Sequence, residues 1–415
     1  MRFQEPFGIC QNYPVRVNQW HLEHDLKTIS SMGVKWLRTE FDWRKIEPRK
    51  GELELEWFDG LVRMCSSMGI HLLPVVAYTP RWMAPRFNLP PDPERFAELV
   101  GTLVKRYHHH VKHWEVWNEA NSYYFWIGDA KQYAALLTSA SAAAKRADPD
   151  SKILMCGLAD PALPSDDFLF EALSHMDERS LDILNLHAYP GVWNDRRVEH
   201  WPALLQSLKR RSEAAGFDKP IWITETGISS RKGDSLADSE QESYLTRAFA
   251  SLLGSGVVER VFWYRFKDET AEEDYSHDGR FGLVAQGTAF GNMRLAYRGY
   301  SRLSRTLPGG MSSLSRAFVL DRPKAGFESY SNLIRTLGQD FELRSSKFDG
   351  TGGAVSLRVR SESVRILWEE ASDGRPRVSL SGSPPGAGNQ DGSAPARKPD
   401  RSETGQTAKS RTEVN

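Results

Sequence analysis

The sequence of 415 residues lacks several features that mark other classes of protein. Its three cysteines, Cys10, Cys65 and Cys156, are too few and too widely spaced for a disulfide framework or a zinc-ligand pattern. Basic and acidic residues balance at 54 each, so the composition gives no reason to expect a nucleic-acid or membrane-surface partner. We therefore expect a globular chain whose three thiols are buried.

Long apolar segments are also absent. The chain opens MRFQEPFGIC, without the apolar run of a signal peptide, and no stretch approaches the ~20 apolar residues that span a bilayer. The sequence as it stands therefore predicts a cytoplasmic protein without a membrane anchor. If the start of the natural chain is missing from this sequence, the alternative is a secreted or periplasmic protein.

Residues 1–305 contain a regular alternation of short apolar runs and amphipathic stretches. The stretches between the runs have apolar residues at three- and four-residue spacing, as helices do. Eight runs are predicted to be strands: 7–10, 35–41, 71–78, 113–119, 152–159, 181–189, 220–227 and 260–266. Their starts lie about 36 residues apart, which is typical of a (β/α)8 TIM barrel. An open doubly wound sheet is the alternative, but no glycine-rich phosphate loop follows the first run.

The pattern changes after the predicted barrel. Residues 306–371 contain short alternating segments such as GAVSLRVRSESVRILWEE, which predict a small β-rich appendage. Residues 372–415 are predicted to be a disordered tail. From about Ser381 onward the chain has no aromatic residue, Leu, Ile or Met to bury.

Two glutamates lie at the ends of strongly apolar strands of the predicted barrel. Glu119 closes HWEVWNE, and Glu225 lies in IWITETG, three strand–helix units later. The carboxyl ends of the strands form the active-site face of such a barrel, so the two carboxyl groups should lie on one face. Paired carboxyl groups perform glycoside hydrolysis, with retention at ~5 Å separation and inversion at ~6.5–9.5 Å.

Asn118 and Glu119 raise a geometric problem because they are consecutive. Strict alternation would point their side chains to opposite faces of the strand. Both can serve one site only if a bulge or the end of the strand redirects one of them.

Aromatic residues in the loops after the strands are candidates for sugar binding. Trp126 follows the fourth strand and is expected to be an outer platform for a sugar ring, as are Trp82 and Trp193. Tyr264 and Asp268 follow the eighth strand and are expected to line the same cleft.

The histidine-rich tract YHHHVKH at 107–113 has the composition of a metal site. It precedes the fourth strand, however, and so lies on the face opposite the active site. We predict a solvated turn there, and the expected chemistry requires neither a metal nor another cofactor.

The two glutamate motifs resemble those of the clan A glycoside hydrolases. The resemblance implies that Glu119 in WNE is the acid/base and that Glu225 in TETG is the nucleophile of a retaining mechanism. Residues 41–85, from FDWRKIEP to YTPRWMAP, are most similar to glycoside hydrolase family 39 and its bacterial relatives, and the similarity spans about residues 7–303. One departure is Ala120, where the clan usually has proline; it removes no reactive group.

The same resemblance implies supporting roles for five more residues. Arg38 matches an arginine near the nucleophile, and Asn118 matches an asparagine that holds the sugar 2-hydroxyl. His187 and Tyr189 match a pair on the sixth strand, with the tyrosine near the nucleophile. Trp263 matches a tryptophan on the eighth strand that forms the floor of the sugar site.

The sequence thus predicts a retaining β-glycosidase acting on an oligo- or polysaccharide, with bacterial polysaccharide favoured. The acid/base is expected to keep its proton until the charge of the nucleophile is consumed. A transglycosylase using the same site and a carbohydrate-binding barrel without turnover are the alternatives. For Arg38, an ordinary ion pair with Glu40 or Asp42 is the alternative to contact with the nucleophile.

Overall fold

The computed structural model describes residues 1–15, 17–159, 166–192, 197–230, 235–268, 280–285, 322–349, 351–370 and 376–381. Its central element is a sheet of eight parallel strands in the order β6-β5-β4-β3-β2-β9-β8-β7. The strands are β2 (Phe7–Cys10), β3 (Trp36–Asp42), β4 (His71–Ala77), β5 (His113–Val116), β6 (Lys152–Leu154), β7 (Leu184–His187), β8 (Ile221–Thr226) and β9 (Val258–Tyr264). Parallel bridges from Leu154 to Ile183 and from Leu158 to Leu186 join the two outer strands and close the barrel.

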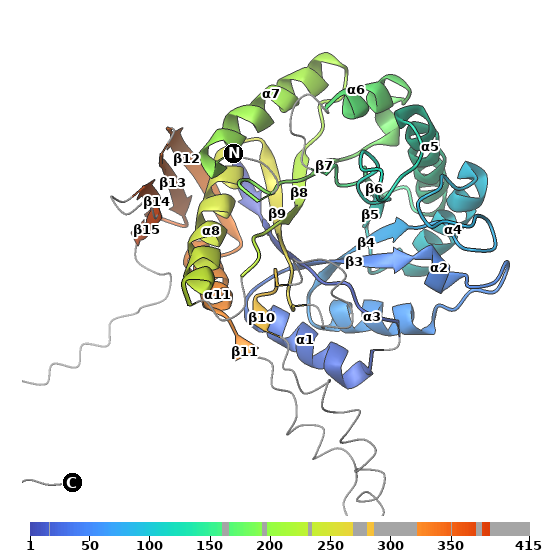
Figure 1. Ribbon diagram of the computed structural model, residues 1–415, viewed down its shortest axis with the longest axis horizontal. Coiled ribbons are helices and arrows are strands. Elements are labelled where there is room, and N and C mark those ends of the chain that lie inside the picture. The colour runs from blue at the N-terminus through green and yellow to red at the C-terminus, as the bar shows by residue number, and fades with distance from the viewer. Residues whose placement is uncertain are drawn as a thin grey trace, which may run out of the picture.

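Helices surround this barrel and alternate with its strands (Figure 1). They are α1 (Gln19–Ser31), α2 (Trp43–Ile46), α3 (Glu56–Ser67), α4 (Pro93–Tyr107), α5 (Ala130–Ala147), α6 (Asp166–Ser174), α7 (Trp201–Ala214), α8 (Ser235–Gly254) and α11 (Ala325–Leu337), with short 3-10 turns η1 (Glu178–Ser180) and η2 (Val198–His200). The predicted (β/α)8 fold is confirmed, and each of the eight predicted runs overlaps a strand. Among the described residues, no helix combines the length and the apolar composition needed to cross a bilayer.

Local sequence explains where these helices begin. Asp92 accepts a hydrogen bond from the Arg95 amide at the start of α4, and Pro93 occupies a position where no amide hydrogen is needed. Asp129 and Gln132 form a reciprocal capping box at the start of α5. Both helices then turn a stripe of apolar residues toward the strands.

Inside the barrel, a separate apolar cluster fills the space below the carboxyl ends of the strands. It comprises Cys10, Trp36, Leu73, Leu154, Ile183, Trp222 and Phe262. Residues on alternate positions of the same strands, such as Ile9 and Leu37, belong to the larger cluster under the helices. The polar residues of the site therefore lie above an apolar layer that fills the barrel.

The helix α11 is the main difference from the predicted domain boundaries. It lies within the predicted appendage, yet it packs against α8 and completes the ring of barrel helices (Figure 1). Tyr330 on this helix is fully buried, and its hydroxyl donates to the Gly8 carbonyl of β2 at 2.7 Å. The barrel therefore does not end at residue 305: its last helix ends at Leu337, after a long connection from β9.

The β-rich appendage is an antiparallel sheet in the order β1-β12-β13-β14-β15. Its strands are β1 (Arg2–Gln4), β12 (Asp340–Phe348), β13 (Gly353–Val359), β14 (Glu362–Glu370) and β15 (Pro376–Ser381). The first strand comes from the predicted barrel and the last from the predicted tail. The strand β15 forms because its residues pair with β14, Val378 opposite Trp368 and Leu380 opposite Ile366. The rest of the predicted tail, and residues 286–321, lie outside the described residues.

A two-stranded ladder and several side chains attach the later segments to the barrel. The strands β10 (Val284–Ala285) and β11 (Arg322–Pro323) pair just before α11. The Trp368 indole donates to the buried carboxylate of Glu199 at 2.6 Å, and Arg197 pairs with Glu370 at 2.8 Å. The appendage is thus packed on the outside of the barrel beside α8.

Gly8 provides a test of the interior packing. A Cβ at this position would overlap the ring of Phe262, which is fixed inside the barrel. We expect Gly8→Ala to lower the free energy of unfolding by ~1–3 kcal/mol because the ring has no free space to enter. The control is Gly60→Ala in α3, where the nearest atom would be 3.8 Å away and helix propensity should improve. Urea denaturation of both variants measures this, and an equal effect of the two substitutions would contradict the described packing.

Candidate active site

The site is built around the guanidinium group of Arg38 on β3, which is buried. Its Nε and Nη2 donate to the two oxygens of Glu115 on β5, both at 2.7 Å. Its Nη1 donates to Oε1 of Glu225 on β8 at 2.5 Å, and Nη2 also reaches Oδ1 of Asn118 at 2.9 Å. One buried cation therefore joins two carboxylates and the asparagine. Arg38 contacts the predicted nucleophile, and it does not pair with Glu40 or Asp42 among the described contacts.

Glu225 receives a second donor on its other oxygen. The hydroxyl of Tyr189 donates to Oε2 at 2.6 Å. Burial alone would raise the pKa of Glu225, but the facing His187 and Arg38 and the hydrogen bonds from Tyr189 and Arg38 outweigh burial. The pKa of Glu225 therefore lies below its usual range, and the carboxylate is held ionised with its position fixed.

The backbone at the end of β5 resolves the problem of the consecutive Asn118 and Glu119. Trp117 has φ 71° and Glu119 has φ 43°, both in the left-handed region that residues with a side chain seldom adopt. The chain is held in this path because the Trp117 amide donates to Val76 at 3.0 Å and the Glu119 amide to Gly157 at 3.1 Å. The break in alternation lets Asn118 face Arg38 while Glu119 faces His187.

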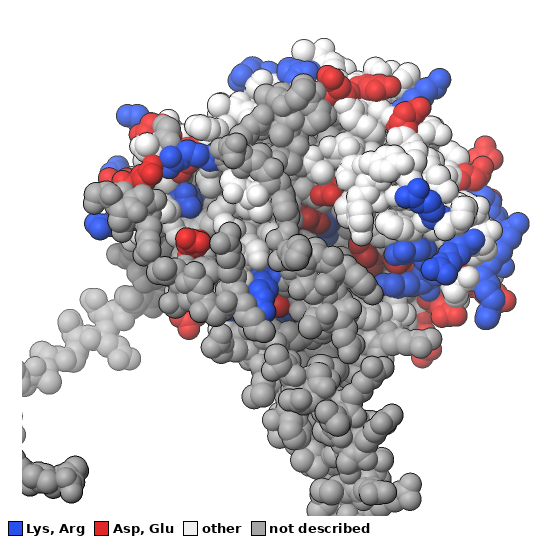
Figure 2. Space-filling view, viewed as in Figure 1, with Lys and Arg blue, Asp and Glu red and all other residues white. Residues whose placement is uncertain are grey.

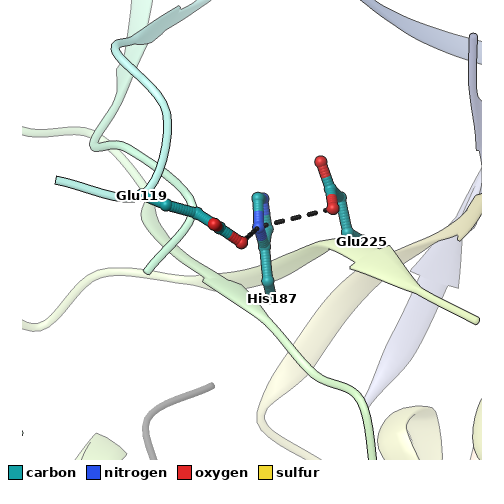
Figure 3. A group of neighbouring side chains, drawn as sticks. All are labelled: Glu119, His187 and Glu225. Carbon is teal, nitrogen blue, oxygen red and sulfur yellow. Dashed lines mark hydrogen bonds and ion pairs between the residues drawn. The ribbon is translucent and has the colours of Figure 1, made fainter. Parts of the chain in front are cut away.

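His187 on β7 lies between the two predicted catalytic carboxyl groups (Figure 3). Its Nδ1 is 2.7 Å from Oε1 of Glu119 and 3.5 Å from Oε2 of Glu225. An ionised carboxylate only accepts hydrogen bonds, so Nδ1 carries the hydrogen when Glu119 is charged. The other side of the ring lies against Gly157, where any Cβ would overlap Nε2. The fully buried imidazole therefore fits in this position only because residue 157 has no side chain.

Glu119, His187 and Glu225 each present one possible metal-ligand atom, and these atoms lie within 4.8 Å of one another. However, Arg38 and Tyr189 already donate to both oxygens of Glu225. A cation at this position would lie close to the Arg38 charge and would have to displace these donors. The donor set therefore favours a carboxyl pair over a metal centre.

Two predicted substrate-binding residues are not placed in the site. Trp263 is fully buried and faces the helices: its ring contacts Tyr244 of α8 at 6.2 Å, and its Nε1 donates to the Phe281 carbonyl at 3.2 Å. Trp126 is also buried, packed edge-on against Trp117 at 5.1 Å. Neither ring can be a sugar platform in this structure.

Tyr264 takes the place expected for Trp263. Alternation along β9 turns Tyr264 into the barrel, where its ring lies edge-on to Tyr189 at 6.5 Å and to Phe281 at 5.8 Å. It is only partly buried, so it has surface to offer to a ligand above the carboxylates.

The structure also shows where most of the other residues singled out in the sequence lie. Trp82 is partly buried, and its indole donates to the Glu47 carbonyl at 2.8 Å. Asp268 accepts from Lys324 at 2.8 Å and from the Gly282 amide at 2.9 Å, so it supports the chain after β9. Trp193 lies outside the described residues. In the histidine tract, His113 lies on β5 and stacks on Trp222 at 5.1 Å, within the lower part of the barrel.

Glu115 is the residue that sequence reasoning missed. It is fully buried, and its Oε1 also accepts from the Gly157 amide at 3.2 Å. The signal was present in HWEVWNE, because a glutamate in the middle of a strand with tryptophan and valine neighbours requires a buried partner.

Removing the central cation should be costly for the fold as well as for the site. We expect Arg38→Met to lower the free energy of unfolding by ~3–5 kcal/mol, because Glu115 is left as a buried charge without its partner. The control is Arg106→Met, which breaks an exposed ion pair with Asp59 and should cost less than ~1 kcal/mol. Urea denaturation at neutral pH compares the two, and similar small losses would show that Glu115 does not depend on Arg38.

Comparison with known proteins gives two matching family models. A model described as β-galactosidase, glycoside hydrolase family 42, matches residues 11–98, and a model described as the glycosyl hydrolase catalytic core matches residues 132–284. The β-galactosidase BgaH of Haloferax lucentense is 26% identical over 140 residues, which are 27% of this chain and 21% of that enzyme. The match thus spans about a fifth of the length of this curated relative.

Solved structures resemble the chain over a larger part of its length. A family 39 glycoside hydrolase from Bacteroides cellulosilyticus has a TM-score of 0.66 at 18% identity, covering 90% of this chain and 72% of that one. A family 39 β-xylosidase from Caulobacter crescentus has a TM-score of 0.61 at 17% identity, covering 89% and 78%. The chain therefore shares the barrel fold of these family 39 structures, and the family models of glycoside hydrolases match two parts of it, in agreement with the resemblance found in the sequence.

Proposed function

We propose that this chain is a retaining β-glycosidase that hydrolyses glycosidic bonds in an oligo- or polysaccharide. The observation that carries the proposal is the separation of its two carboxyl groups. One oxygen of Glu119 and one of Glu225 lie within 4.8 Å of each other. Retaining enzymes have a separation of about 5–5.5 Å, whereas inverting enzymes need about 6.5–9.5 Å to admit a water molecule.

In the first step, the Glu225 carboxylate attacks the anomeric carbon. A bond forms between this carbon and a Glu225 oxygen while the bond to the leaving oxygen breaks, and Glu119 gives its proton to that oxygen. Arg38 and Tyr189 hold Glu225 ionised and aimed beforehand. Asn118 accepts a hydrogen bond from Arg38 and in this mechanism binds the 2-hydroxyl of the reacting sugar.

In the second step, water replaces the enzyme on the sugar. Glu119, now ionised, takes a proton from the water, whose oxygen bonds to the anomeric carbon and releases Glu225. Glu119 thus acts first as an acid and then as a base. His187 is within 2.7 Å of Glu119 and holds its carboxyl group in the position that both steps require.

The comparisons support this reaction class. The matching curated relative is called a β-galactosidase, and a similar structure is called a β-xylosidase. The complete set of Glu119, Glu225, Arg38, Asn118 and Tyr189 supports an active enzyme over a binding protein that has lost turnover.

The two carboxyl groups should respond differently to substitution. On 4-nitrophenyl β-glycosides, Glu225→Gln should lose turnover, because an amide is not a nucleophile. Glu119→Gln should lower kcat/KM by about 10²–10⁴-fold for substrates with poor leaving groups, which need the proton, and by less for 2,4-dinitrophenyl glycosides.

Azide distinguishes the two roles. Added to Glu119→Gly, it should restore turnover and give a β-glycosyl azide, since it attacks the glycosyl-enzyme. Added to Glu225→Gly, it should give the α-glycosyl azide by direct attack. Proton NMR of the first wild-type product should show the β anomer. Substantial activity of Glu225→Gln, or an α first product, would contradict the mechanism.

The pH dependence should report the hydrogen bond from Tyr189. Glu225 must be ionised to attack, so kcat/KM falls as the pH falls through its pKa. Tyr189→Phe removes one cause of the lowered pKa of Glu225, so the acidic limb should move to higher pH. The control is Tyr133→Phe, whose hydroxyl bonds to Val116 and Cys156 and to no carboxyl group among the described contacts, and which should leave the limb in place. An unmoved limb in Tyr189→Phe would contradict the role of this hydrogen bond.

A further inference from the structure

Glu40 is a carboxyl group at the mouth of the barrel that the mechanism does not use. It lies two residues beyond Arg38 on β3, so its side chain is on the same face and nearer the carboxyl end of the strand. Its Oε1 accepts a hydrogen bond from the Tyr78 hydroxyl at 2.9 Å. Its other oxygen has no hydrogen-bond donor among the described residues. Glu40 is partly buried, which leaves this oxygen able to accept from a ligand.

Tyr78 begins a continuous set of aromatic rings. We call Tyr78, Phe87, Phe125 and Tyr124 the aromatic wall. The Tyr78 ring is 5.4 Å from Phe87 and 6.2 Å from Phe125, and the Tyr124 ring is 6.0 Å from Phe87 and 4.7 Å from Phe125. The wall therefore runs from Glu40, next to the Arg38 cluster, out to Tyr124. Its residues follow β4 and β5, whose carboxyl ends open on the active-site face.

The outer end of the wall is both exposed and rigidly supported. The side chain of Tyr124 is 68% exposed. The backbone beneath it is fixed because the buried Asn88 amide donates to the Tyr124 carbonyl at 2.9 Å, and the Trp117 indole donates to the Phe125 carbonyl at 3.0 Å. The Tyr124 ring is thus presented to solvent on a fixed backbone, where a ligand can stack on it.

The charge distribution around the site agrees with this arrangement. Acidic side chains lie at the centre of the face shown in Figure 2, and the surface on the side of β5 and β6 is largely uncharged. Along the aromatic wall, the Arg44 guanidinium lies 5.1 Å from the ring centres of Tyr78 and Phe87, and its charge is compensated by Asp42 at 2.7 Å. Aromatic rings beside a carboxylate suit a sugar, whose C–H face stacks on the rings while its hydroxyl groups donate to the carboxylate.

We propose that Glu40 and the aromatic wall form a subsite for a second, neutral sugar ring next to the one that is cleaved. The inference rests on the proposed glycosidase function and deepens it. It makes an oligo- or polysaccharide the substrate, in place of a sugar linked to a small non-sugar group. Glu40 binds hydroxyl groups at the inner end of the subsite, and Tyr124 stacks on the ring at the outer end.

The test compares substrates with and without a second sugar. Screening 4-nitrophenyl β-D-xyloside, galactoside, glucoside and mannoside identifies the cleaved sugar. The β-1,4-linked oligosaccharides of that sugar, two to six units long, are then assayed. The quantity measured is kcat/KM for the oligosaccharide divided by kcat/KM for the aryl glycoside.

Tyr124→Ala should lower this ratio about five- to tenfold, because it removes one stacking ring. Tyr124→Trp should keep the ratio because stacking is retained. Tyr123→Ala is the matched control: it is the same change one residue earlier, on a ring that is 71% exposed and lies outside the wall. It should change the ratio by less than roughly twofold. Glu40→Gln should lower the ratio as well, while circular dichroism shows that the fold is intact.

The outcomes separate the two proposals. If no glycoside or oligosaccharide is hydrolysed by the wild type, the glycosidase proposal fails and the subsite fails with it. If the wild type hydrolyses aryl glycosides, the subsite alone is overturned by any of three results: oligosaccharides are not cleaved, Tyr124→Ala leaves the ratio unchanged, or Tyr123→Ala lowers it equally.

Discussion

The guanidinium of Arg38 is the interaction on which the site depends. It lies between Glu115 and Glu225, so one positive charge compensates two buried negative ones across β3, β5 and β8. Glu115 takes two of the hydrogen bonds and anchors the guanidinium, while Glu225 takes only one and keeps its outer oxygen for Tyr189. The uneven sharing gives the two carboxylates different tasks: one orients the cation, and the other is oriented by it. Such an arrangement needs a closed barrel, because only closure brings strands so far apart in sequence around a single cation.

The left-handed backbone at Trp117 and Glu119 performs the second essential task. A regular strand could turn only one of Asn118 and Glu119 toward the substrate. The unusual torsions are maintained by the burial of the Trp117 ring among Tyr78, Phe96 and Trp126 and by hydrogen bonds to the neighbouring strands. Packing between the strands and the helices thus supports the placement of Asn118 and Glu119 inside the barrel. Strained backbone often occurs at functional sites. The buried Trp126 contributes here through packing.

The sequence was sufficient to predict the strands and the carboxyl pair, which follow from local patterns. It was insufficient for residues whose roles depend on contacts with distant parts of the chain. The eight strands were predictable because each is a short apolar run between polar segments, and the carboxyl pair because each glutamate ends such a run. Trp263 and Tyr264 could not be distinguished in VFWYRF, since aromatic residues fill both faces of that strand and hide the phase of its alternation. Glu115 was missed because its partner Arg38 lies 77 residues earlier. The helix α11 was assigned to the appendage because its long separation from β9 interrupts the regular repeat of the barrel.

The position of α11 has a consequence for the order in which the chain can fold. The β2 strand at the start of the chain contacts Tyr330 near its end, and β1 pairs with β12, whose residues follow α11. During synthesis β1 therefore cannot pair, and β2 cannot make its contact with Tyr330, until residues more than 300 positions later have emerged. Until then, the rim of the barrel beside β2 exposes apolar residues, and contacts this distant in sequence form slowly. The nascent chain should consequently depend on protection from chaperones until α11 and β12 have left the ribosome.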